Sequence, residues 1–156
     1  MDPVTRSEEL FKKGYNCAQA VLGAFCEDGG LPFDTAMMLS SSFGGGMGRM
    51  REVCGACSGM FMAAGLLYGY ATPETGAPKK ELYERIRALA DRYREQNGSI
   101  ICRELLGGTP EIGGTPEART AAYYQKRPCA EYVKCAAAIF DEYRREIASE
   151  ESPATE

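Results

Sequence analysis

Histidine and tryptophan are both missing from the 156 residues. The lack of histidine excludes Ser-His-Asp and Cys-His catalysis, and it excludes every imidazole metal site. A metal bound by this chain would therefore have thiolate or carboxylate ligands. An enzymatic reaction would depend on Cys, Asp, Glu, Lys or Tyr side chains.

Clusters of positive charge are also missing. The net charge is −4 and no run of Lys or Arg is longer than two residues, which argues against a nucleic-acid partner. The N-terminal "MDPVTRSEELFKKG" has no basic segment followed by an apolar one, so no signal peptide is visible. We therefore expect a reducing cytoplasm, where clustered cysteines more often bind metal or do redox chemistry than form disulfides.

Residues 53–73 carry no charge, which raises the question of a membrane helix. The run contains four glycines, two cysteines and several other polar residues, and the chain has no second segment like it. We expect no membrane insertion. The pattern instead predicts a central, buried, glycine-rich helix in a soluble bundle.

Apolar periodicity predicts helices along the rest of the chain. Thr5 and Glu8 are spaced as a capping box for a first helix that ends near Phe25, and Asp34 is placed to cap a short second helix. The third helix begins near Glu52 or Val53. Further helices are predicted over 79–96, 99–106, 118–125 and from Pro128 onward, with a loop over 107–116.

No segment alternates apolar and polar residues as a strand would. The sequence therefore predicts an all-α single domain over residues 1–149, a bundle of five to six helices. Residues 150–156 are expected to be a disordered tail.

Seven cysteines are many for this length. Cys54 and Cys57 form a C-x-x-C in the predicted first turn of the third helix, where unpaired backbone N–H groups and the helix dipole favour a thiolate. Arg49 and Arg51 just upstream would favour it too. The alternative is that the two cysteines are simply small buried residues.

The other cysteines are dispersed. Cys17 and Cys102 fall within predicted helices and favour a core role, Cys129 follows Pro128 at a helix start, and Cys26 and Cys135 are expected to be structural. Spacings of 27 to 48 residues match neither zinc ribbons nor ferredoxins. Such cysteines can meet only if separate helices bring them together.

"FGGGMGRM", residues 43–50, is glycine-rich but fits neither dinucleotide nor P-loop patterns. It is most simply a hinge that lets the backbone pack closely against the next helix. In the alternative, amides of Gly45 and Gly46, with Arg49, contact a cluster or an anion.

Four segments together resemble a known family: "GYNCAQAVLGAF", "FGGGMGRMREVCGACSG", "GSIICRELLG" and "RPCAEYVKCAA". They are similar to the small redox-active proteins named for their C…GCAxxG…C…C pattern, a domain that also occurs in split-Soret cytochromes. The resemblance implies that the characteristic cysteines are Cys17, Cys54, Cys102 and Cys129. Cys57 departs from the family pattern.

The resemblance implies an iron–sulfur cluster, expected to be [2Fe–2S], held by these four cysteines for electron transfer or redox sensing with an unidentified partner protein. One alternative is a metal-free thiol oxidoreductase with Cys54 as nucleophile and with Cys57, or a distant member of the four cysteines, as resolving thiol. Another is a structural zinc or interaction module. The sequence leaves a homodimer open.

Overall fold

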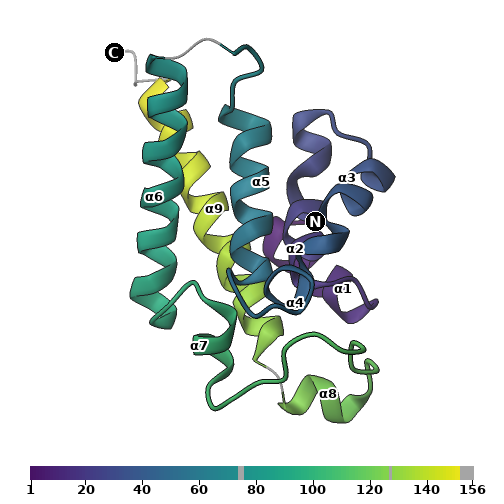
Figure 1. Ribbon diagram of the computed structural model, residues 1–156. Helices are drawn as coiled ribbons and strands as arrows, with labels where there is room; N and C mark the ends of the chain where they lie inside the picture. Colours follow the sequence, from purple (N-terminus) through teal and green to yellow (C-terminus); the bar gives the residue numbers. More distant parts are fainter. Residues whose placement is uncertain (74–75, 127, 152–156) are drawn as a thin grey trace.

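The computed structural model describes residues 1–73, 76–126 and 128–151, which form helices joined by irregular segments (Figure 1). Strands are absent from these ranges, where Val53 and Ile101 form an isolated bridge. The α-helices are α1 (Pro3–Lys12), α2 (Cys17–Phe25), α3 (Phe33–Ser40), α4 (Gly44–Met47), α5 (Gly55–Tyr68), α6 (Ala77–Asn97), α7 (Cys102–Leu106), α8 (Ala121–Lys126) and α9 (Cys129–Glu151).

The all-α prediction is confirmed. The number of helices differs from the expected five to six: the described residues form six α-helices of eight residues or more, and α4, α7 and α8 are additional short segments. Short 3-10 turns, η1 (Cys26–Gly29) and η2 (Ser41–Phe43), flank α3. α9 continues to Glu151, and the remainder of the predicted tail, residues 152–156, lies outside the described residues.

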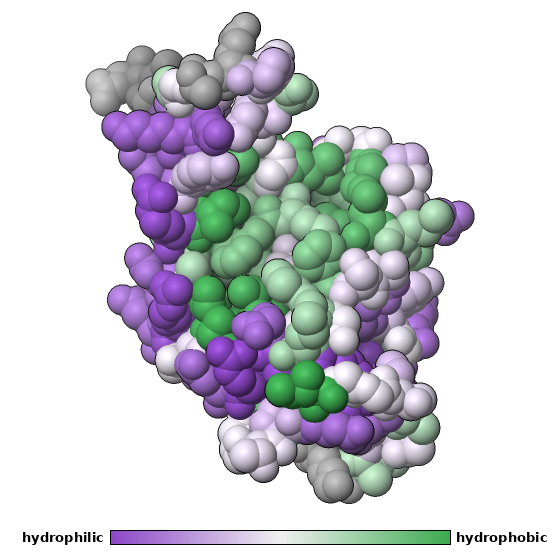
Figure 2. Space-filling model, in the orientation of Figure 1, coloured by the Kyte–Doolittle hydropathy of each residue, from purple (hydrophilic) through white to green (hydrophobic). Residues whose placement is uncertain are grey.

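The predicted central helix is α5, which lies between α6 and α3 with α9 behind it (Figure 1). Small residues let it approach α2 closely, since a Cβ built on Gly59 would lie 2.6 Å from the carbonyl oxygen of Ala18. Its first half is buried, whereas residues 65–68 are partly exposed. Apolar side chains gather on this face of the molecule (Figure 2).

No helix among the described residues is long and apolar enough to cross a membrane. The core instead consists mainly of side chains from α1, α2, α5, α6 and α9. α2, α6 and α9 pack against α5, while α1 packs against α2 and α9. Phe25 and Phe140, for example, meet edge to face with ring centroids 4.8 Å apart.

The predicted first helix is wrong, because the structure divides it into α1 and α2. Gly14 adopts a left-handed φ of 109°, and Asn16 then caps α2 through a capping box with Gln19. The N-cap of α1 is Asp2 rather than Thr5. Cys17 is therefore the first residue of a helix and not an interior one.

Three other helices begin later or earlier than expected. α3 starts at Phe33 after Pro32, so Asp34 lies inside the first turn. α5 starts at Gly55 with Cys54 as its N-cap. α7 starts at Cys102 rather than at Ser99. By contrast, α6 agrees with the prediction, including the proline in its first turn.

Candidate functional site: a cavity lined by four cysteines

The loop before α5 has an unusual backbone. Residues 45–49 all have positive φ, and so does Arg51, although Met47, Arg49 and Arg51 are not glycines. Each non-glycine residue in this region costs about 1–2 kcal/mol. We call residues 44–51 the glycine loop. Strain of this kind is characteristic of functional sites.

Hydrogen bonds between the glycine loop and its flanking residues hold this backbone in place. Gly48 N–H donates to the carbonyl of Ser42 (2.8 Å), and Glu52 N–H donates to that of Gly46 (2.9 Å). Across the chain, Cys102 N–H donates to the carbonyl of Glu52 (2.6 Å). These bonds join the loop to α7.

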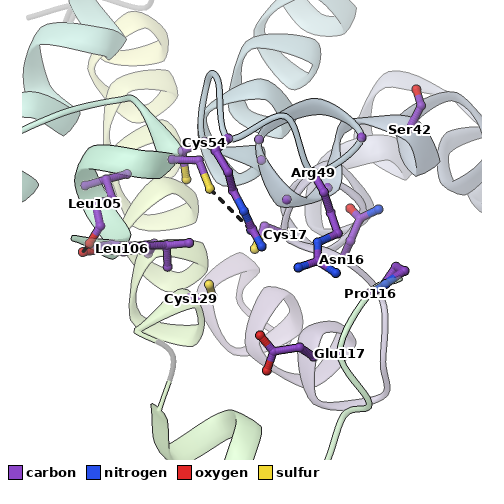
Figure 3. Close-up of a pocket in the computed structure, with 18 of the residues that line it drawn as sticks. Asn16, Cys17, Ser42, Arg49, Cys54, Leu105, Leu106, Pro116, Glu117 and Cys129 are labelled. Atoms are coloured by element: carbon purple, nitrogen blue, oxygen red, sulfur yellow. Dashed lines mark hydrogen bonds between the residues drawn. The ribbon is translucent and has the colours of Figure 1, made fainter. Parts of the chain in front are cut away.

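A cavity of about 360 Å³ lies beside the glycine loop (Figure 3). Four of the seven cysteines line it, and we call them the cavity cysteines: Cys17, Cys54, Cys102 and Cys129. Figure 3 shows Cys17, Cys54 and Cys129 around one space, with Arg49 and Glu117 at its edge. Residues separated by 27 to 48 positions in sequence thus share one site.

Every cavity cysteine stands at the start of a helix. Cys17, Cys102 and Cys129 are the first residues of α2, α7 and α9. Cys54 is the N-cap of α5. The longer helices α2, α5 and α9 therefore direct the positive ends of their dipoles at the cavity, which favours negative charge on sulfur.

Glycines permit the close approach of these cysteines. A Cβ built on Gly55 would lie 3.0 Å from the Cβ of Cys17, and one on Gly46 would lie 2.6 Å from the Cβ of Cys102. Any larger side chain at Gly46 would push Cys102 away from the loop. The glycines therefore shape the site as well as the backbone.

Cys54 is buried and stabilised as a thiolate. Its sulfur accepts a hydrogen bond from the Cys57 thiol, the largest cause that lowers its pKa to about 6. Burial opposes this shift, while the Tyr93 hydroxyl, 3.5 Å away, and the N–H groups of Cys57 and Ala56 add to it. Burial, followed by the bond to Cys54, raises the pKa of Cys57.

Cys17 and Cys102 are stabilised as neutral thiols. The hydrogen bond with Cys129 raises the pKa of Cys17 well above its usual value, and burial acts in the same direction. Burial also raises the pKa of Cys102, against the effect of Arg51, whose Nη1 lies 3.9 Å from its sulfur. The cysteines thus form two neighbouring pairs: Cys17 with Cys129 in the cavity, and Cys54 with Cys57, which is buried behind the cavity lining.

Three arginines line the same cavity: Arg49, Arg51 and Arg119. Arg49 and Arg51 donate to carbonyls of an irregular segment, residues 107–120, which we call the lining loop. Arg119, within that loop, donates to the carbonyls of Phe11 (3.3 Å) and Tyr15 (2.9 Å). These carbonyl partners carry no net charge, although Arg49 also meets the carboxylate of Glu111 (4.0 Å). The cavity lining itself holds three arginines and one carboxylate, Glu117.

The sequence-predicted site residues divide into two groups. Gly45, Gly46 and Arg49 line the cavity together with the cavity cysteines. Cys57 is fully buried next to Cys54 and does not line the cavity. Cys26 is buried at the end of α2, and Cys135 on α9 contacts the side chains of Gln96 and Asn97.

Sequence reasoning did not assign Tyr93, Tyr132 or Arg119 to the site. Tyr93 occupies the apolar stripe of α6, and its polar hydroxyl on a buried face was the available signal. Tyr132 lies on α9, and its ring centroid is 6.3 Å from that of Tyr93. Nothing local marks Arg119, because its position depends on the path of the lining loop.

The cavity side chains differ in how well their geometry and their chemistry suit a metal or cluster. Across the three described ranges, no group of three or more His, Cys, Asp or Glu side chains is arranged to hold a metal ion. The donors themselves are four cysteine sulfurs, the ligand type of iron–sulfur clusters. The cavity is of a size typical of cofactor sites. The residues present thus fit a cluster by chemistry, and the thiols would have to turn toward it.

A family model matches residues 15–143, and its description is "Putative redox-active protein (C_GCAxxG_C_C)". The matched span contains all four cavity cysteines, the glycine loop and the lining loop. Searches of curated proteins and of solved structures returned no match.

Proposed function

The chain belongs to the C_GCAxxG_C_C family of redox-active proteins, and we propose that its four cavity cysteines hold an iron–sulfur cluster of the [2Fe–2S] type. The observation that supports this most is their convergence: four residues dispersed in sequence open four different helices and line one cavity. The cluster would serve electron transfer or redox sensing with a partner protein. That partner, a homodimer and the cytoplasmic location stay predictions.

Such a cluster, when bound, accepts and donates single electrons. The chain's own residues supply the environment. Helix N-termini and the cavity arginines stabilise the negative charge of thiolate ligands. Cys17 and Cys102 would each release a proton on ligation, because their pKa values are raised in the folded protein. Leu105 and Leu106, which line the cavity, limit the access of water.

Anaerobic purification tests the proposal. We expect coloured protein with iron and acid-labile sulfide, and visible absorbance that bleaches on reduction. Cys129→Ser should lose most of the iron, whereas Cys135→Ser should retain it. Both positions lie on α9 and are half-buried, so they form a matched pair. Colourless protein, one zinc per chain without iron, or equal loss of iron in both variants would contradict the cluster.

A second candidate is a dithiol oxidoreductase, supported by the contact of Cys57 with the Cys54 sulfur at the start of α5. The Cys54 thiolate would attack a substrate disulfide, forming a mixed disulfide and releasing one substrate thiolate. The Cys57 thiol would then lose its proton and attack the Cys54 sulfur, which releases the second thiolate. The substrate gains two electrons and Cys54–Cys57 is oxidised.

Cys57→Ser separates the two candidates. In a dithiol enzyme it stops turnover and traps the mixed disulfide on Cys54. In a cluster protein it leaves the iron content unchanged, because Cys57 does not line the cavity. Full exchange activity in Cys57→Ser would exclude the dithiol mechanism.

A further inference from the structure

We propose that Arg51 is the internal counter-charge of the cysteine cavity, a positioning residue whose guanidinium acts on the Cys102 sulfur and stabilises the reduced centre. The consequence for reduction rests on the proposed function. The electrostatic claim concerns the cavity alone and can be tested without any metal.

Burial makes Arg51 unusual. The residue is 5% exposed, and water does not solvate a charge in such a place effectively. A buried guanidinium is costly unless an anion lies close to it. Its Nε donates to the carbonyl of Glu111 (3.0 Å) and its Nη1 to the sulfur of Cys102 (3.9 Å). Of these two partners, only the sulfur can become an anion.

The other two cavity arginines differ from Arg51. Arg49 pairs with the carboxylate of Glu111 (4.0 Å). Arg119 lies over aromatic rings, 4.3 Å from the centroid of Phe11 and 4.9 Å from that of Tyr123. Arg51 has no carboxylate within 4.0 Å among the residues that the structure describes. The Cys102 sulfur therefore becomes a counter-ion of Arg51 when it binds as a thiolate.

The backbone holds Arg51 in this position against an intrinsic preference. Its φ is 59°, a left-handed value that a side chain disfavours. Its N–H donates to the carbonyl of Gly45 (3.2 Å), and its carbonyl accepts from the Arg103 N–H (3.2 Å) and guanidinium (3.2 Å). A Cβ on Gly46 would lie 2.8 Å from the Arg51 Cα and 2.6 Å from the Cys102 Cβ. Glycine at position 46 thus allows Arg51 and Cys102 to meet.

The redox consequence follows from Coulomb's law. Reduction adds a negative charge to the centre, and a fixed positive charge next to one sulfur stabilises that added charge more than it stabilises the oxidised state. Removing the charge at Arg51 should therefore lower the reduction potential.

Metal-free protein provides the first test, with iodoacetate and iodoacetamide as probes. The reagents are similar in size and attack the same thiolate, but only iodoacetate is anionic. The ratio of their rates at Cys102, measured by mass spectrometry, therefore reports local charge and cancels differences in thiolate fraction and access. We expect Arg51→Gln to lower this ratio about tenfold and Arg51→Lys to preserve it. Cys135 serves as an internal control.

Arg145→Met, at an exposed residue of α9, is the matched control and should leave the ratio unchanged. Arg51→Met is the second neutral variant, which serves if Arg51→Gln does not fold as judged by circular dichroism. An unchanged ratio at Cys102 in a folded neutral variant overturns the proposal.

Metal-loaded protein provides the second test. A tenfold change in the one-electron equilibrium corresponds to ~59 mV, so we expect the midpoint potential of Arg51→Gln to be lower by about that amount. Arg51→Lys should shift it less and Arg145→Met not at all. An unchanged potential in Arg51→Gln that retains iron overturns the redox part. If the wild type binds no iron, the proposed function fails, while the alkylation ratio still decides the role of Arg51.

Discussion

The helix bundle and the cavity region differ in how their backbones are built. The bundle consists of α1, α2, α5, α6 and α9, with regular backbone and an apolar core. The cavity region consists of the glycine loop, the lining loop and the first residues of helices, with left-handed backbone and buried charge. The comparison indicates that the bundle stabilises the fold. Part of that stability offsets the cost of the strained backbone and of the buried charge at the site.

One close glycine contact in each region shows the same difference between packing and chemistry. Gly59 brings α5 against the backbone of α2, which increases packing in the core. Gly46 brings Arg51 against Cys102, which places a cation beside a sulfur. Both glycines allow a close approach because they have no side chain, but only the contact at Gly46 brings a charged group next to a reactive sulfur.

The largest effect is expected in the bundle, at Phe140. This side chain is fully buried against Phe25 and Tyr68, so Phe140→Ala should reduce the free energy of unfolding by about 3–5 kcal/mol. Denaturant unfolding measures the change. Tyr83→Ala, at a residue 49% exposed, is the control and should cost far less. Equal losses in the two variants would show that the core does not dominate stability.

A smaller loss of stability, with a larger effect on the site, is expected at Gly46. Gly46→Ala combines a left-handed φ of 70° with three contacts below 3.0 Å, which should cost about 2–4 kcal/mol. Gly48→Ala is the control, because Gly48 has a φ of 58° but open space around it, so about 1–2 kcal/mol is expected. Thermal unfolding and the reactivity of Cys102 would be measured together. If Gly48→Ala altered Cys102 as much as Gly46→Ala, steric contact would not be the cause.

The smallest effect on stability is expected at Tyr93, where the change appears in a pH profile. With a pKa of about 6, Cys54 in metal-free protein should gain thiolate character as the pH rises through 6. Tyr93→Phe removes a hydrogen-bond donor to that thiolate, so the midpoint should move to higher pH by roughly one unit. Thiolate absorbance in the ultraviolet measures it.

Tyr132→Phe is the control for this profile, since that hydroxyl donates to the carbonyl of Leu105 (3.1 Å) and not to Cys54. A midpoint that stays near 6 in Tyr93→Phe would show that the Cys57 thiol and the N–H groups of α5 suffice to stabilise the thiolate.

Helices with strong apolar periodicity could be predicted from the sequence, whereas the residues at which most helices begin could not. The helix expected over 79–96 is observed as Ala77–Asn97, because its apolar stripe and its flanking Pro78 and Gly98 all agree. The first helix was predicted as one unit, although Gly14 and the pair Asn16–Gln19 carry a break and a capping box. Apolar residues on both sides of the break hid this signal.

The sequence by itself determined the helical class, the absence of imidazole chemistry and the position of Cys54 at the start of a helix. These are local properties of composition, periodicity and capping. Only the tertiary structure decided that Cys102 also opens a helix and that four distant cysteines meet three arginines at one cavity. Cys102 opens α7 because its N–H is bound by the carbonyl of Glu52, fifty residues earlier in the chain. The spacing of residues along the chain does not predict such a contact, because the packing between helices creates it.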